Sequence, residues 1–167
     1  MTRRLLLVAT VLVAIAWALP AGAQAPATAN LTINATVAAT ARLTISTSAL
    51  NFPDSDPDTT TTILPSEGTM SITAKVKTAS TTTVRLTLNA AGDLSSGSAT
   101  IPISNITWTA GGTGFVAGTL AVGSEVPVAS WTGPGSRLGT QSFTLLNSWD
   151  YAVGSYSASA TYTLSAT

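Results

Sequence analysis

The stretch that most constrains the fold of this chain is residues 154–166, where apolar and hydroxyl side chains alternate. In an extended strand, successive side chains point to opposite faces, so an apolar row lies on one face and serines and threonines lie on the other. This pattern predicts a half-buried strand, and we expect the chain to end inside the sheet that the strand joins. The apolar row consists of Tyr156, Ala158, Ala160, Tyr162 and Leu164.

The same period of two recurs along the chain, whereas no stretch after residue 24 keeps an apolar period of 3.6 residues. Strand patterns at short intervals, separated by Gly-, Pro- and Asp-containing turns, predict one antiparallel β-sandwich. The pattern over 31–52 reads either as one long strand with a break or as two short strands. A change of phase near Asn105 predicts a bulge. The further predicted strands are residues 70–76, 84–88, 101–108, 115–122, 126–131 and 138–146, and Gly or Pro places 115–122 and 126–131 at sheet edges.

The first residues have the pattern of a secretory signal peptide. Arg3 and Arg4 precede an apolar run over residues 5–19, and an Ala-Gly-Ala exit follows. The run is shorter than the roughly 20 residues of a membrane-spanning helix. Cleavage after Ala23 is favoured over cleavage after Ala25, which would leave proline at the new terminus. We therefore expect a signal peptide at 1–23, a flexible segment at 24–30 and a single β-sandwich domain at 31–167. The mature protein is expected to be secreted, from periplasm to cell surface, without a membrane span.

Composition excludes several classes of function. Charged residues make up 8% of the chain, so a basic surface for nucleic acid is absent. The sequence contains no cysteine, and the fold must therefore be held by packing and strand pairing. It contains no histidine either, which removes the commonest general base and the zinc, copper and haem sites that depend on His or Cys. We expect no catalytic residue, no cofactor and no enzymatic activity.

Short motifs at both ends resemble the opening and closing strands of spore-coat-U-type and chaperone–usher pilin-like secreted subunits. The opening carries Ile-Asn-Ala-Thr-Val at 33–37 and Leu-Asn-Phe at 50–52, and the ending carries Gly-Ser-Tyr at 154–156. Pro53 stands where that family usually has glycine after Leu-Asn-Phe, and Ala41 stands where it commonly has the first of two paired cysteines. The resemblance spans most of the mature chain as a pattern.

The resemblance implies an incomplete immunoglobulin-like β-sandwich that serves as a non-enzymatic structural or surface subunit. Such subunits associate by strand addition at an exposed sheet edge, with other copies of themselves or related surface subunits, and a periplasmic chaperone binds them. The residues at 31–37 are then either the donor strand for another copy or the domain's own first strand. The exposed edge would be Tyr156, Ala158, Ala160, Tyr162 and Leu164, and the donor row would be Leu31, Ile33, Ala35 and Val37.

An alternative function is a free-standing carbohydrate-binding or adhesive module with surface glycans as partners. Trp131 and Trp149, which lie beside Gly-rich or polar loops, are the candidate ligand aromatics, although core packing also explains such residues. The alternating Asp54, Asp56 and Asp58 form a candidate Ca²⁺ loop. This loop has Thr59 where an EF-hand has glycine and Pro65 where it has its last acidic ligand. A solvated acidic turn is therefore the favoured explanation, and we expect no metal site.

Overall fold

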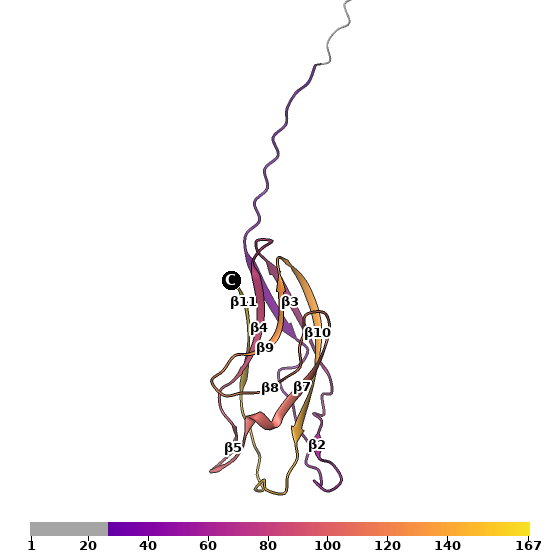
Figure 1. The fold of residues 1–167 in the computed structure, drawn as a ribbon, viewed down its shortest axis with the longest axis vertical. Helices are drawn as coiled ribbons and strands as arrows, with labels where there is room; N and C mark the ends of the chain where they lie inside the picture. The colour runs from indigo at the N-terminus through magenta and orange to yellow at the C-terminus, as the bar shows by residue number, and fades with distance from the viewer. Residues whose placement is uncertain (1–26) are drawn as a thin grey trace, which may run out of the picture. The chain divides into compact units, whose positions relative to one another are not determined.

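The structure is a computed structural model that describes residues 27–167, and the predicted signal peptide at 1–23 lies outside these residues. Residues 36–167 make one compact unit, and the described residues before it, 27–35, contain no strand. The compact unit is an antiparallel β-sandwich (Figure 1), which confirms the predicted fold class. In the described part of the chain, the only helical element is a single 3-10 turn, η1 (Ile103–Asn105), and no helix is long and apolar enough to span a membrane.

The first sheet has the strand order β1-β3-β10-β7-β8, and β2 pairs with the last residues of β10. Every pairing in it is antiparallel. Its strands are β1 (Thr40–Ile45), β2 (Thr62–Ile63), β3 (Met70–Lys77), β7 (Ile106–Gly111), β8 (Gly118–Thr119) and β10 (Gly135–Leu146).

The second sheet has the order β11-β4-β9, also antiparallel. Across the two layers, β1 lies close to β11 and β8 lies close to β9. The hairpin of β5 and β6 forms a small separate sheet. The bounds are β4 (Thr83–Ala90), β5 (Leu94–Ser96), β6 (Ala99–Ile101), β9 (Val126–Thr132) and β11 (Ala160–Ala166).

The core lies between the two sheets because every second residue of the central strands points inward. On β3 and β4 the apolar residues are buried and their neighbours are more exposed, as the alternation predicts. Trp108 is 2% exposed, packs against the Phe143 ring at 5.9 Å between centroids, and donates a hydrogen bond from Nε1 to the Val116 carbonyl at 2.9 Å. This tryptophan anchors the loop over residues 112–117 to the core.

The predicted strands at 70–76, 84–88, 126–131 and 138–146 are confirmed, and β9 lies at a sheet edge as its proline predicted. Three expectations are wrong. Residues 31–37 form no strand, and the predicted strand at 115–122 is reduced to β8. The change of phase near Asn105 is the 3-10 turn η1 rather than a bulge. Oδ1 of Asp93 accepts a hydrogen bond of 2.8 Å from the Ile103 amide, and this bond holds the turn in place.

The closing strand begins later than its alternation predicts. Tyr156 and Ala158 lie before β11 and are not part of its edge. Ser157 exchanges two backbone hydrogen bonds with Ser95, at 3.0 and 3.1 Å, and the Tyr156 hydroxyl donates to the Ala152 carbonyl at 2.7 Å. These local contacts hold residues 155–158 against β5, so only Ala160, Tyr162 and Leu164 of the predicted edge belong to the strand.

Candidate functional site

The candidate site is the outer edge of β11. One edge of β11 pairs with β4, and no strand within residues 27–167 pairs with the other. Thr83 and Thr167 exchange two backbone bonds of 2.9 Å, which identifies them as a hydrogen-bonded pair of the ladder. Because such pairs alternate along an antiparallel ladder, the backbone N–H and C=O groups of every second residue point away from β4. Those residues are Ala160, Tyr162, Leu164 and Ala166.

The apolar side chains beside this edge are incompletely covered. Tyr162 and Leu164 are half-buried, although their partners across the ladder, Leu88 and Leu86, are buried. On the facing sheet, the inward residues Leu43 and Ile45 of β1 are also half-buried. We call these four half-buried residues the open side of the sandwich. An added strand would remove their remaining apolar surface from water, which is favourable.

The edge of β11 carries no charged residue, whereas the edge of β1 carries Arg42 directly opposite Lys75. Charged side chains on an edge strand oppose pairing with another chain, and their absence permits it. The sequence of β11 therefore does not protect its edge, in contrast to the sequence of β1.

The edge of β9 is protected in another way. The Val116 amide donates to Val128 at 2.9 Å and the Ser130 amide donates to Gly114 at 3.1 Å, so loop backbone already covers it. Pro127 also removes one N–H donor from this edge. The remaining terminal strand, β8, has two residues. In the described part of the chain, β11 is therefore the longest edge that is neither covered nor charged.

A polar contact across the core fixes β11 to the sandwich. The Tyr162 hydroxyl donates to Oε1 of Gln141, a fully buried residue on β10 of the opposite sheet. Burial raises the pKa of the Tyr162 hydroxyl above its usual value, so this hydroxyl remains a neutral donor. The contact holds β11 in register with the core although it has one neighbour in its own sheet.

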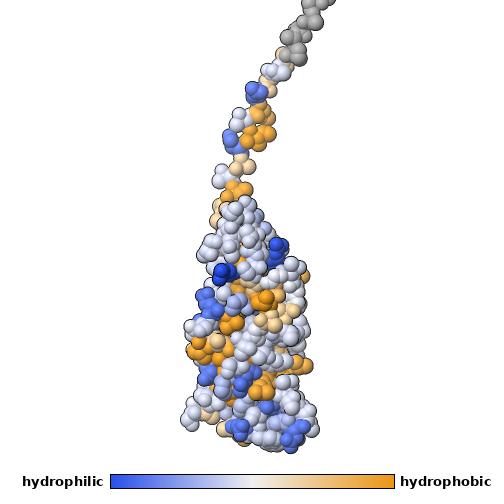
Figure 2. All heavy atoms as spheres, in the orientation of Figure 1, coloured by the Kyte–Doolittle hydropathy of each residue, from blue (hydrophilic) through white to orange (hydrophobic). Residues whose placement is uncertain are grey.

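The candidate donor row is exposed. Leu31 and Ile33 are each 83% exposed and Val37 is 76% exposed, and Ala35 is exposed as well. Residues 27–39 form no strand. Figure 2 shows hydrophobic and hydrophilic residues exposed in turn along this stretch. Three large apolar side chains in water are a surface that association with a partner would remove.

The two candidate ligand tryptophans have different surroundings. Trp131 faces the core and is 9% exposed, with the Arg137 guanidinium carbon 5.9 Å from its ring centroid. This burial rules it out as a ligand platform, and the cation–π contact instead closes one end of the core. Trp149 is 69% exposed, and its Nε1 donates to Asp58 Oδ1 at 3.0 Å. Of the two, only Trp149 is placed to meet a ligand.

The aspartates of the candidate Ca²⁺ loop serve the loop itself. Asp56 Oδ1 accepts from the Asp58 amide at 2.9 Å, as in an Asx turn, and Asp58 accepts from Trp149. Across residues 27–167, no three His, Cys, Asp or Glu side chains are placed to hold a metal ion together. Asp54, Asp56 and Asp58 are therefore not brought together as a ligand set.

Sequence reasoning missed Gln141, which links β10 to β11. A signal existed, because Gln141 occupies an inward position of the predicted strand at 138–146, two residues before Phe143. A polar residue at a core position needs a partner, and Tyr162 is one of the two tyrosines in the apolar row of the closing stretch.

Comparison of the chain with protein-family models gives no match, and comparison with curated proteins gives none either.

Proposed function

We propose that this protein is a secreted, non-enzymatic structural subunit that associates with other copies, or with related surface subunits, by strand addition at the edge of β11. The observation that carries the proposal is the seven-residue edge of β11, which is uncharged and has unmatched backbone donors and acceptors within residues 27–167. Main-chain pairing at such an edge supplies affinity, and alternate side chains supply specificity. A periplasmic chaperone would cover the same edge before assembly.

The order of the strands supports an incomplete immunoglobulin-like fold. In that fold, strands A, B, E and D form one sheet, and C, F and G form the other. The order β1-β3-β10-β7 corresponds to A-B-E-D, and β4 with β11 corresponds to C and F. Strand G would then lie beside β11, on the edge that is uncovered. β9, which pairs with the other side of β4, has no counterpart in that seven-strand order.

The donor in this proposal is residues 31–37. The segment has seven residues, as β11 has, and its apolar row would cover Tyr162 and Leu164 while its backbone pairs with the outward groups of β11. Burying a Leu, Ile or Val side chain contributes about 1.5–3 kcal/mol. Three such side chains give residues 31–37 the apolar row that a donor needs and that residues 27–30 lack.

A second copy is a better source of the donor than the chain's own segment. Thr40 lies opposite Lys77, at the end of the sandwich where β11 finishes opposite Val84. To reach its own β11, the chain would have to reverse within Ala38 and Ala39 and cross between sheets about 10 Å apart. Two alanines offer none of the Gly, Asn or Pro residues that favour tight turns.

A proline at the acceptor edge tests the proposal. Ala160→Pro removes an N–H that points away from β4 and places the ring at the open edge, so the domain should keep its stability while SDS-resistant oligomers of residues 24–167 decrease strongly. Ala41→Pro is the matched control, because Ala41 is an exposed alanine whose N–H points away from β3 at the edge of β1. Gel analysis without boiling gives the oligomers. Loss of oligomers in the Ala41 variant alone would place the acceptor at β1 and contradict the proposal.

The second candidate function is a carbohydrate-binding or adhesive module, favoured by the exposure of Trp149 and its hydrogen bond to Asp58. An exposed indole beside a carboxylate suits a sugar, which offers an apolar face and hydroxyl donors. In this case Trp149→Ala should remove the response of the protein on a glycan array, whereas Ala160→Pro should not change it. A wild-type protein that binds no glycan on the array eliminates this second candidate.

A further inference from the structure

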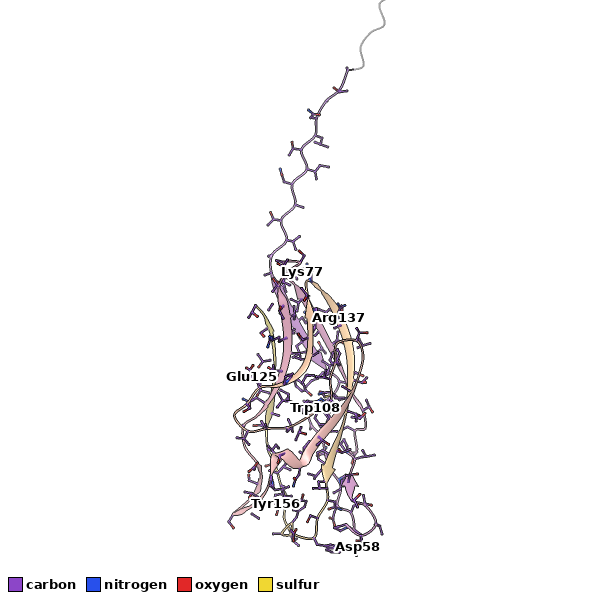
Figure 3. The ribbon with its side chains drawn as sticks, viewed as in Figure 1. Asp58, Lys77, Trp108, Glu125, Arg137 and Tyr156 are labelled. Carbon is purple, nitrogen blue, oxygen red and sulfur yellow. The ribbon has the colours of Figure 1, made fainter. Side chains whose placement is uncertain are left out.

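The charges of the compact unit are separated along its strands. We define the basic end as the end where β1, β4 and β10 begin and β3, β9 and β11 finish, and the acidic end as the opposite one. Figure 3 shows Lys77 and Arg137 toward the basic end and Asp58 at the acidic end. The basic residues in residues 27–167 all lie within the strand residues nearest the basic end, and they are Arg42, Lys75, Lys77, Arg85 and Arg137.

Six of the seven acidic residues lie in the loops toward the other end. Three precede β2, one follows β4, one follows β10, and one stands just before β3. The seventh, Glu125, lies near the middle of the unit (Figure 3), where it lines the same pocket as Arg85. Asp58 is oriented by Trp149, and Asp150 Oδ2 accepts from the Ser148 hydroxyl at 3.0 Å. The set at the acidic end consists of Asp54, Asp56, Asp58, Glu67, Asp93 and Asp150.

The basic end holds like charges side by side. Arg42 and Lys75 are direct cross-strand partners, both exposed, and Lys77 follows on the same face of β3. Like charges directly opposite each other destabilise a strand pair. A negatively charged partner would relieve this repulsion, and the acidic end of a second copy supplies one.

We propose that copies of this protein dock head to tail, with the acidic end of one copy against the basic end of the next. Contact between two like ends would oppose charges of the same sign, which costs several kcal/mol when they are brought together. Contact between unlike ends uses two different surfaces of the same protein. Such heterologous contacts leave a free end on each side, and they build open chains rather than closed dimers.

The docking also sets the direction of the added strand, a consequence that rests on the proposed function. Only Ala38 and Ala39 separate the donor residues from β1, which begins at the basic end. With that end against the acidic end of the acceptor, Val37 would lie near Ala160 and Leu31 near Ala166. The donor then runs antiparallel to β11, which is the slightly more stable pairing per residue.

Two sets of charge reversals in the mature chain test the docking. One variant carries Arg42→Glu, Lys75→Glu and Lys77→Glu, and the other carries Asp54→Lys, Asp56→Lys, Asp58→Lys and Asp150→Lys. Each variant alone presents two ends of like sign, so its association, followed by light scattering at low salt, should be at least about tenfold slower than that of the wild type. An equimolar mixture of the two variants has complementary ends again and should recover the wild-type rate. The mixture should lose its faster association, relative to each variant alone, near 1 M salt, where the Debye length is about 3 Å.

Circular dichroism of each variant establishes that it is folded. If the mixture associates no faster than the separate variants, head-to-tail docking is overturned. The Ile33→Asp variant distinguishes failure of head-to-tail docking from failure of strand addition. If that change leaves SDS-resistant oligomers intact while the mixture still recovers its rate, the docking stands and the strand addition is wrong.

Discussion

Replacing Ile33 with aspartate is expected to abolish the SDS-resistant oligomers of residues 24–167 and to leave the stability of the domain unchanged. Ile33 is 83% exposed, and surface substitutions of this kind change the free energy of unfolding by about 0.5 kcal/mol or less. In the assembled state the same side chain would be inserted beside Tyr162 and Leu164. An unpaired carboxylate buried there costs several kcal/mol, and about 3 kcal/mol already weakens association about a hundredfold.

Thr32→Asp is the matched control for this experiment. It introduces the same charge one residue away, in the row that would face solvent after strand addition, so most of the oligomer should remain. Gel analysis without boiling and a thermal unfolding curve measure the two properties separately. Equal oligomer levels in both variants and the wild type would show that residues 31–37 are not the donor.

The largest expected loss of stability follows from Trp108→Ala. Trp108 is 2% exposed, contacts Phe143, and holds the Val116 carbonyl through its indole N–H. Truncating a buried tryptophan to alanine costs about 3–5 kcal/mol, because the packed volume is lost and a cavity remains. This is a large fraction of the roughly 5–15 kcal/mol by which domains are stable. Urea unfolding of residues 24–167 should show the loss as a lower midpoint.

Trp149→Ala is the control for the size and type of the residue removed. Trp149 is 69% exposed, so its removal should change the unfolding free energy by less than about 1 kcal/mol. A destabilisation as large as that of Trp108→Ala would mean that the loop over residues 147–154 is part of the core. If Trp108→Ala left the free energy of unfolding unchanged, this would contradict the placement of β7 in the first sheet.

The sequence predicted the central strands because packing and periodicity agree there. At 70–76 and 84–88 every inward position is apolar, and at 138–146 Phe143 and Leu145 point inward. Each of these strands is paired on both sides. The tyrosine, alanine and leucine row of the closing stretch likewise predicted β11. Its alternation also covers Tyr156 and Ala158, which local bonds to Ala152 and Ser95 hold outside the strand.

The remaining features of the candidate site depend on which strands pair with each other, and the alternation of apolar residues in the sequence does not reveal this. The row at 31–37 alternates as regularly as β3 does, yet it forms no strand because no neighbour within residues 27–167 pairs with it. Trp131 and Trp149 both stand beside turn-forming residues, and only the register of β9 against β4 turns Trp131 into the core. The separation of charge between the two ends also follows from strand direction, which the linear order of residues hides.

The pairing of β4 with β11 has a consequence for how fast the protein reaches its native state. Residues 83–90 pair with residues 160–166, and β3 pairs with β10, so both sheets are built from partners far apart in the chain. Domains dominated by such long-range pairings fold over milliseconds to seconds, much more slowly than helical bundles. During that interval β11 and the apolar donor row are available to neighbouring chains before either sheet is complete. The rate of folding relative to the rate of association, rather than the final contacts alone, would then determine how much of the protein reaches an ordered assembly.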